Sequence, residues 1–358
     1  MKVTTIHDVA SQARVSITTV SRVLNDREGV DPKTRARVLQ AIERLHYLRN
    51  TNAANLKQRH TDFVAVILRG RRNIFLTDLA ERVMDLGRQT GFQFLLEFID
   101  EKADEFLTAR RIYMERNLSG IIFLGANLKD REKDLRRLDL PCVFATVDAS
   151  HLSLAKLSSI SVDNYRAGQE AAKRLMMMGH TSIALLGYFA DAYDSTGLRL
   201  NGALDFLRSR GIDFDPDLFA DCDFSLQNAY EAARKLLKRN KRFTALIAMS
   251  DTVAIGAGKA LYDSGIRVPF DVSLIGFDGI QEGEFCKPSL ATMAQPADAL
   301  ARGTVDLLAR MLGGGAGSHV LLDCAYKAGG SLRSLPQAAL SSAVQLPDVP
   351  GVFPDGPV

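Results

Sequence analysis

Two short amphipathic patterns stand near the start of the chain, separated by a polar turn. In the first, apolar residues recur at positions 6, 9, 10 and 13, which is the spacing of one helical face, and Thr5 precedes them as an N-cap. In the second, Val20, Val23 and Leu24 share a face, and Ser16 stands before them at the cap position. The pattern therefore predicts two helices joined by a tight turn.

A third helical pattern follows after residue 30. Asp31 and Pro32 suit the N-cap and the first turn of a helix, because the Asp side chain can accept free backbone N–H groups and Pro lacks one. An apolar stripe then recurs at helical spacing, long enough to close a three-helix core with the first two helices. The stripe consists of Val38, Leu39, Ile42 and Leu45.

The outward face of the second helix carries side chains that can bind DNA. Arg22 can donate two hydrogen bonds to a guanine edge, Asn25 and the hydroxyls can bond phosphate oxygens, and Ile17 can contact a thymine methyl. The alternative is a helical hairpin whose polar face is simply solvated. Charge favours DNA, because residues 1–60 hold eleven Lys and Arg against five Asp and Glu, although the whole chain carries only +3.

From about residue 62, short apolar runs alternate with longer amphipathic stretches. Apolar strands that alternate with helices indicate parallel sheets covered on both faces. The segment is too long for one such sheet, and a break near residues 148–160 divides it into two similar halves. The predicted strands are 63–68, 92–98, 120–124, 142–146, 183–186, 219–222, 245–249 and 272–276, and the predicted helices include 76–90, 103–117, 164–178, 226–239, 252–264 and 297–312.

The composition is that of an ordinary globular protein, with 358 residues of which 46% are hydrophobic and 24% are charged. No apolar run approaches the roughly 18 residues of a membrane-spanning helix, and no signal-like segment opens the chain, so we expect a cytoplasmic protein. Cys142, Cys222, Cys286 and Cys324 are far apart, which predicts reduced, mostly buried thiols. The six histidines lack metal-ligand spacing and no nucleophile motif is present, so we expect no metal, no cofactor and no enzyme activity.

Three motifs in the head resemble the DNA-binding domain of the LacI/GalR family of bacterial repressors. They are D-V-A at residues 8–10, V-S-x-x-T-V-S-R-V-L-N at 15–25 and K-T-R-x-x-V at 33–38, followed by Tyr47 and Asn50. The resemblance implies that residues 49–61 form a hinge that becomes helical on operator DNA, where Leu56 enters the minor groove and bends the duplex. Leu56 is otherwise an ordinary linker leucine. The expected DNA-binding residues are Thr5, Ser16, Ile17, Thr18, Thr19, Ser21, Arg22, Asn25, Thr34 and Leu56.

The resemblance extends through the two halves to about residue 333. It implies two lobes similar to periplasmic sugar-binding proteins, between which the chain crosses near residues 148–161, near 278–290 and near Lys327. The expected α/β protein has a helix-turn-helix head of residues 1–48, a hinge of 49–61, and a two-lobed effector-binding and dimerisation domain of parallel sheets over 62–333. The tail of residues 334–358 is rich in Pro and has no heptads, so we expect it to be disordered and to form no tetramer-making helix.

A ligand in such a body lies between the lobes, at the carboxyl ends of the strands. The family motif S-x-x-x-R-x-x-G at residues 195–202 implies that Arg199 binds hydroxyls or an anionic group of the effector. Asp251 and Asp278 lie near the ends of predicted strands, although such carboxylates also serve as helix caps or lie on the surface. The expected effector-binding residues are Phe75, Asp148, Ser195, Arg199, Phe224, Asp251, Asp278 and Gln295.

The chain departs from the family pattern in two places within the body. Where most members have N-P-F-F, residues 71–76 read RRNIFL, with Arg69 just before. This basic cluster either selects an acidic or phosphorylated effector or forms a solvated loop near the DNA, and we favour the loop. Gly279 replaces a second Asp of the family, so hydroxyl recognition by carboxylates rests on Asp278.

These observations predict a repressor of carbohydrate-metabolism genes whose affinity for pseudo-palindromic operator DNA is switched by a small effector, a sugar or sugar derivative. Because helix-turn-helix heads read two half-sites, a homodimer is the expected minimum. The alternatives are a regulator that responds to a purine or to an acidic or phosphorylated metabolite, a sugar-binding receptor without DNA activity, and a sugar-phosphate enzyme.

Overall fold

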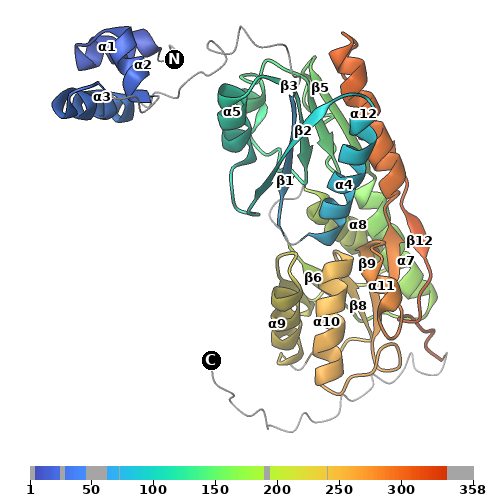
Figure 1. Cartoon of the computed structure of the whole chain (residues 1–358). Helices are drawn as coiled ribbons and strands as arrows, with labels where there is room; N and C mark the ends of the chain where they lie inside the picture. Colours follow the sequence, from blue (N-terminus) through green and yellow to red (C-terminus); the bar gives the residue numbers. More distant parts are fainter. Residues whose placement is uncertain are drawn as a thin grey trace. The chain divides into compact units, whose positions relative to one another are not determined.

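The computed structural model describes residues 5–24, 29–45, 63–71, 73–188, 194–239 and 241–336. The chain forms two compact units, Met1–Phe63 with Leu107–Leu118 and Val64–Phe106 with Ser119–Val358 (Figure 1). Within the described ranges, no helix is long and apolar enough to cross a membrane.

The head contains the three predicted helices, α1 (Ile6–Ala13), α2 (Ile17–Leu24) and α3 (Pro32–Arg44). Thr5 caps α1 through a reciprocal pair, because its hydroxyl accepts from Asp8 N while the Asp8 carboxylate accepts from Thr5 N. Ser16 Oγ accepts from Thr19 N at 3.2 Å, and the Asp31 carboxylate accepts from the first amides of α3. All three predicted caps are confirmed.

The head core is made of small and branched residues from all three helices. Val9, Val20 and Val38 are fully buried in it. The prediction for Leu39 was wrong, because this side chain is 53% exposed. Ala41 is buried instead, since positions 38, 41, 42 and 45 share one helical face while position 39 is turned away by about 100°. The other buried residues are Ala10, Ala13 and Val23.

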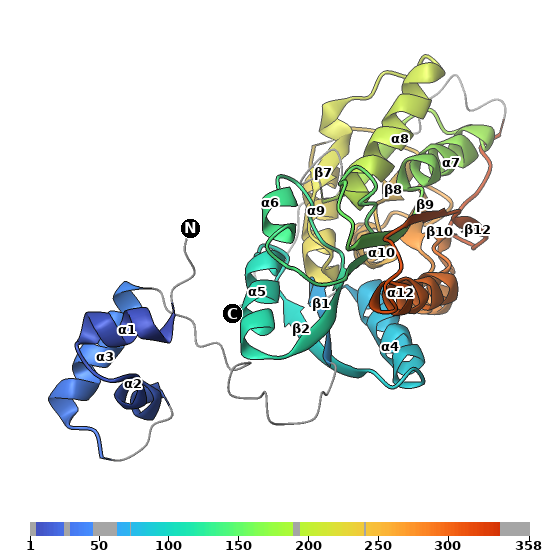
Figure 2. The same cartoon turned by 90° about the horizontal axis from the view of Figure 1, so that it is seen from above.

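The first lobe of the body has a six-stranded sheet with the order β11-β5-β4-β3-β1-β2. Its neighbouring strands β3, β4, β5 and β11 pair in parallel. Helices α4 and α12 lie side by side and pack their apolar faces into the same core as the sheet (Figures 1 and 2). The elements are β1 (Phe63–Arg69), α4 (Ile74–Arg88), β2 (Gln93–Ile99), β3 (Leu118–Leu124), α6 (Glu132–Leu135), β4 (Cys142–Ala145), β5 (Leu157–Val162), α12 (Ala297–Leu312) and β11 (His319–Leu322). Between β2 and β3 the chain forms α5 (Glu105–Glu115), most of which belongs to the first compact unit.

The second lobe repeats this plan with the order β12-β10-β9-β8-β6-β7. Its strands pair in parallel except for the antiparallel pair β10 and β12. Helices α7 and α8 cover one face of the sheet, and α9 and α10 cover the other (Figure 2). The elements are α7 (Asn164–Met177), β6 (Ile183–Gly187), α8 (Ser195–Ser209), η2 (Pro216–Leu218), β7 (Phe219–Asp221), α9 (Leu226–Leu237), β8 (Ala245–Ala248), α10 (Asp251–Asp263), β9 (Ser273–Asp278), α11 (Glu282–Phe285), β10 (Ala291–Ala294) and β12 (Ala325–Lys327).

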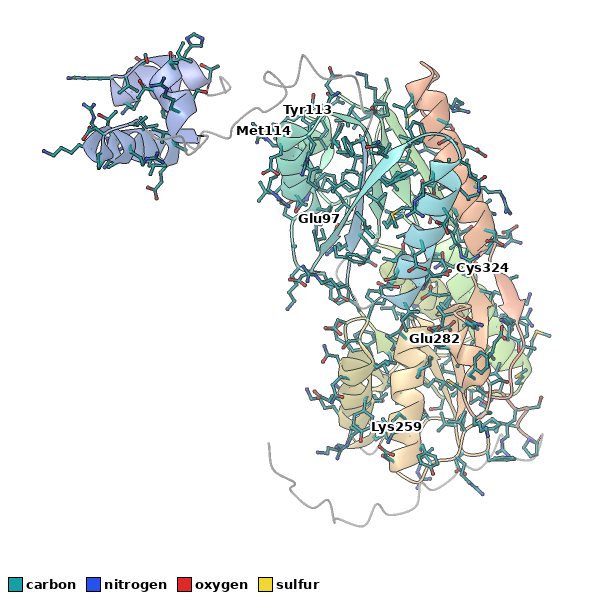
Figure 3. The ribbon with its side chains drawn as sticks, in the orientation of Figure 1. Glu97, Tyr113, Met114, Lys259, Glu282 and Cys324 are labelled. Carbon is teal, nitrogen blue, oxygen red and sulfur yellow. The ribbon has the colours of Figure 1, made fainter. Side chains whose placement is uncertain are left out.

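The chain crosses between the lobes three times, and two of the predicted positions were wrong. Residues 148–161 do not cross, because β5 adds to the first sheet, so the chain leaves that lobe only between β5 and α7. Residues 278–290 do not cross either, because β10 pairs with β9, and the second crossing lies at Gln295 and Pro296, between β10 and α12. The third lies at Asp323 and Cys324, close to the predicted Lys327 (Figure 3).

The boundary of the tail also differs from the prediction. Leu335 N donates to Met178 O at 2.8 Å, so the backbone is still bonded to the second lobe beyond residue 334. His180 contributes to the same attachment, because its Nε2 lies 3.0 Å from Arg333 O and its Nδ1 lies 2.9 Å from Thr244 Oγ1. The predictions for residues 337–358 lie outside the described residues.

Candidate functional site

A pocket lies between the two lobes of the body, formed by residues that follow the carboxyl ends of the strands. About 700 Å³ of empty space lies between its walls, part of which is open to solvent. Six of the eight predicted effector-binding residues line it: Phe75, Ser195, Arg199, Phe224, Asp278 and Gln295. The other lining residues include Arg69, Asn73, Glu101, Thr146, Tyr188 and Asp194.

Arg199 forms the centre of the polar wall. Its Nε donates to Asn164 Oδ1 at 2.8 Å, and its Nη1 donates to Met249 O at 2.7 Å. The same Nη1 lies 3.2 Å from Asp278 Oδ1, in an ion pair whose two side chains are only 4% and 7% exposed. The guanidinium also lies 4.9 Å from the ring centre of Phe277. These contacts fix the guanidinium plane and neutralise its charge.

The close packing of α7 against α8 determines where Arg199 lies. A Cβ at Gly168 of α7 would stand 2.0 Å from the carbonyl oxygen of Arg199, so the two backbones can meet only because this residue is glycine. Asn164 begins α7 and therefore lies within reach of the guanidinium. The start of α8 is fixed by Asp194, whose carboxylate accepts from Gly197 N.

Asp278 ends β9 with a φ of 107°, a conformation that residues other than glycine rarely adopt. Its carboxylate accepts from Gln295 Nε2 at 2.8 Å in addition to its contact with Arg199. Burial raises the pKa of Asp278, and the Arg199 charge opposes that shift. Backbone strain of this kind is often found at functional sites.

Asp251, which was predicted to contact the effector, is fully buried and does not line the pocket. Its Oδ2 accepts from Gly279 N at 2.6 Å and from Ile280 N at 2.9 Å. Burial, and then the charge of Asp278, raise the pKa of Asp251 to about 8. Asp251 stands at the start of α10, so its side chain turns under the backbone that follows β9 and not toward the pocket.

Asp148 does not line the pocket either. Its carboxylate accepts from Ser150 N and from Ser150 Oγ, both at 2.9 Å, so it stabilises its own turn.

The first lobe contributes a mixed-charge wall. Arg69 lines the pocket and its Nε donates to Glu101 O at 2.7 Å, so this member of the basic cluster is not part of a solvated loop. Arg71 fits the loop interpretation, because it is exposed and lies 3.8 Å from Asp100. Burial, and then Asp223, raise the pKa of Glu101. The sequence prediction missed Glu101, although its position just after a predicted strand is a usable signal.

A hydrogen bond between Ser195 and Thr146 joins the two lobes within the pocket. Ser195 Oγ donates to Thr146 O at 2.7 Å. Thr146 follows β4 and has a φ of 73°, which is unusual for a β-branched residue. The two pocket residues other than glycine that have positive φ, Thr146 and Asp278, thus face the cleft from opposite lobes.

Aromatic side chains provide the apolar part of the pocket. Phe75 comes from the first turn of α4. Tyr188 and Phe224 follow β6 and β7, and their ring centres are 6.4 Å apart. Aromatic faces of this kind can pack against the apolar face of a ring-shaped ligand.

The predicted DNA-binding residues of the head gather around α2. Ser16, Ile17, Thr18 and Arg22 are exposed, and Thr19 and Ser21 are partly exposed. Thr5 and Ser16 also act as caps, and Thr34, at the start of α3, accepts from Arg37 Nη2 at 3.3 Å. Asn25, Leu56 and the hinge lie outside the described residues.

The cysteines are reduced, as the spacing in the sequence predicts. The four thiols are free; Cys142 and Cys222 are buried, and burial raises the pKa of each to about 12. Cys286 and Cys324 are only partly buried. Within the described ranges, no group of three or more His, Cys, Asp or Glu side chains is arranged to hold a metal ion.

A helix-turn-helix head and a two-lobed body with an interlobe pocket define a ligand-binding transcriptional regulator. The family of bacterial regulatory proteins called lacI matches residues 5–50, and a periplasmic binding protein-like domain matches residues 172–332. The HTH-type transcriptional regulator MalR of Clostridium butyricum is 33% identical over 322 residues, which cover 89% of this chain and 96% of that protein.

Two further comparisons agree with these matches. Catabolite control protein A of Priestia megaterium is 31% identical over 293 residues, or 82% of this chain and 87% of that protein. The solved complex of the transcriptional regulator CelR with cellobiose has a TM-score of 0.69 and 27% identity, and it covers 92% of this chain and 99% of that one. The chain belongs to the LacI family of bacterial transcriptional regulators.

Proposed function

We propose that this protein represses carbohydrate-metabolism genes, and that a neutral sugar or sugar derivative in the interlobe pocket switches its affinity for operator DNA. The observation that carries the proposal is the buried pair of Arg199 and Asp278 at the polar wall. A guanidinium already neutralised by a carboxylate is a weak site for an anion, but the pair offers donors and acceptors side by side, as vicinal hydroxyls require.

The charge of the whole lining supports a neutral ligand over a phosphorylated one. Arg69 and Arg199 face three carboxylates, those of Glu101, Asp194 and Asp278. An anionic effector would therefore meet more carboxyl groups than cations in this lining. Stacking surfaces at Phe75 and Phe224 suit the apolar face of a sugar ring. They also suit a purine, which keeps that class as the second candidate.

The DNA-binding half of the proposal rests on α2 and on the basic head. Arg22 donates hydrogen bonds to a guanine edge, and the surrounding hydroxyls bind phosphate oxygens. The protein acts as a homodimer on a pseudo-palindromic operator in the cytoplasm, without enzyme activity, and Leu56 in the hinge of residues 49–61 enters the minor groove.

Switching follows from the position of the pocket between the lobes. A ligand that binds one lobe arrangement better than another shifts the population toward it, and operator DNA must then change the ligand affinity by the same factor. The bond from Ser195 to Thr146 spans the cleft, so a ligand that enters there competes with it or strengthens it.

The test is a thermal-shift panel of neutral sugars, sugar phosphates, purines and nucleosides against the full chain. We expect a neutral sugar to raise the melting temperature in a concentration-dependent way. Asp278→Asn should abolish that shift, and Asp85→Asn, which changes an exposed carboxylate of α4, should keep it. A shift with purines or phosphorylated ligands alone would refute the sugar proposal in favour of that class.

A further inference from the structure

We propose that Asp251 is a positioning residue, whose carboxylate anchors the Gly279–Ile280 backbone and so holds the Asp278 side chain beside Arg199 in the pocket. The proposal rests on the proposed function of that pocket, because it assigns a role to a residue behind the wall. Asp251 itself is fully buried and is not among the pocket residues, so it acts on a ligand only through its neighbours.

The anchoring contact is a double one. Asp251 Oδ2 accepts from Gly279 N at 2.6 Å and from Ile280 N at 2.9 Å. These are the two amides that follow Asp278, so the bonds determine how the chain leaves β9. A buried backbone N–H that loses its acceptor is costly, so these two bonds hold the segment in place.

The backbone at Asp278 needs such an anchor because its φ of 107° is unfavourable for a residue with a Cβ. On its other side, Asp278 O accepts from Gln295 N at 3.0 Å. The strained residue is therefore held from both directions, by β10 through Gln295 and by α10 through Asp251. With either contact removed, the segment can relax and the Asp278 carboxylate can move away from Arg199.

The Asp251 carboxylate packs closely against β9. A Cβ on Gly276 of β9 would lie 2.2 Å from Asp251 Oδ1. Glycine at this position of the strand leaves the space that the carboxylate occupies while it binds the Gly279 and Ile280 amides. Ser250 caps α10 by accepting from Val253 N, so capping this helix does not depend on Asp251.

The experiment compares Asp251→Ala, Asp251→Asn and a control, Asp263→Ala, in the full chain. Asp263 lies at the opposite end of α10 and binds Lys259. The first readout is amide hydrogen exchange of Gly279 and Ile280, measured beside Ile275 of β9 as an internal reference for global unfolding. The second is the affinity for the sugar that gives the largest thermal shift with the wild-type chain.

We expect Asp251→Ala to speed exchange of the Gly279 and Ile280 amides by about tenfold relative to Ile275, and to weaken sugar binding by a similar factor. Asp251→Asn should restore most of both properties, because its amide oxygen can still accept the two bonds. Asp263→Ala should match the wild type in both.

Unchanged exchange of the Gly279 and Ile280 amides in Asp251→Ala would overturn the proposal. Weaker sugar binding without faster exchange would also overturn it, because Asp251 would then affect the sugar by another route. If Asp251→Ala does not fold, Asp251→Val replaces it, because a Val side chain fills more space and still has no acceptor, and wild-type exchange in that folded variant contradicts the proposal. If no sugar binds the wild-type chain, the proposed function fails, while the exchange measurement still decides the anchoring.

Discussion

Replacing Arg199 with Ala tests whether the polar wall of the pocket is also a structural unit. The substitution removes the bonds to Asn164 and Met249 O and leaves Asp278 as a buried carboxylate without its cation. Breaking a buried ion pair from one side costs about 3 to 5 kcal/mol. Because Gln295 still donates to Asp278, we place the loss of unfolding free energy at about 3 to 4 kcal/mol.

The assay is urea unfolding of the full chain, followed by circular dichroism, for Arg199→Ala, Asp278→Ala and the double variant. We expect the double variant to lose less than the sum of the single losses, by about 1 to 3 kcal/mol, because each partner is needed only while the other is present. The exposed pair of Arg88 and Asp85, at 2.7 Å, is the control and should show little coupling.

Additive losses for Arg199 and Asp278 would refute this reasoning, since they would mean that the pair does not act as one unit. The expected destabilisation also affects functional tests. A loss of ligand response in Arg199→Ala combines a lost contact with a weakened body, so Asp278→Asn, which preserves the size of the side chain, is the sharper probe of binding.

Three further predictions follow from other parts of the chain. Gly276→Ala should lower unfolding free energy by about 1 to 3 kcal/mol in urea titrations, because the new Cβ would lie 2.2 Å from Asp251 Oδ1; an unchanged midpoint would contradict this. Arg22→Ala should weaken specific operator binding by about 1 to 3 kcal/mol in anisotropy titrations while non-specific binding barely changes, and a parallel loss of both would make Arg22 a phosphate contact. Folding raises the pKa of Asp251 from 3.8 to about 8, so between these pH values the folded chain keeps a proton that the unfolded chain releases. The free energy of unfolding therefore falls as the pH rises through this interval. Asp251→Asn should therefore flatten the pH dependence of the unfolding free energy over that interval, and an identical slope in the variant would count against the assignment.

Local features of the head could be predicted from the sequence because they depend on neighbouring residues. The predicted caps at Thr5, Ser16 and Asp31 are correct, since a short polar side chain just before an amphipathic run can accept the free N–H groups of the first helical turn. Leu39 was assigned to the core because an apolar residue beside a helical stripe can belong to either face. Only its angular position relative to Val38 distinguishes them.

The body was predicted less completely, for identifiable reasons. Eight strands and six helices agree with the structure to within a few residues. β5 was missed because the sequence LSSISV places serines in a buried strand, and β10, β11 and β12 have only four, four and three residues. Those omissions misplaced the first two crossings. α8 was not among the predicted helices, since Gly197 and Gly202 weaken its pattern.

The candidate site could also be predicted only in part. Motif and strand-end position placed Arg199, Asp278 and Gln295 in the pocket. They could not say that Asp251 turns beneath the backbone, because an acid after a strand can point into a cleft or cap the next segment, and only the three-dimensional path of residues 279–280 decides it. Glu101 was missed because the contacts that bury it come from Asp223 and Phe224, more than one hundred residues away.

The proposed switch requires that a sugar in the interlobe pocket controls operator binding. The most direct measurement is the operator dissociation constant, by fluorescence anisotropy, on a duplex selected from random sequence by the full chain, with and without the sugar that gives the largest thermal shift. We expect the sugar to change that constant by about 5- to 150-fold in the wild type and in Asp85→Asn, and to have no effect in Asp278→Asn. An operator dissociation constant that stays the same when the wild-type pocket is saturated, or that responds equally in Asp278→Asn, would contradict control by a sugar in this pocket.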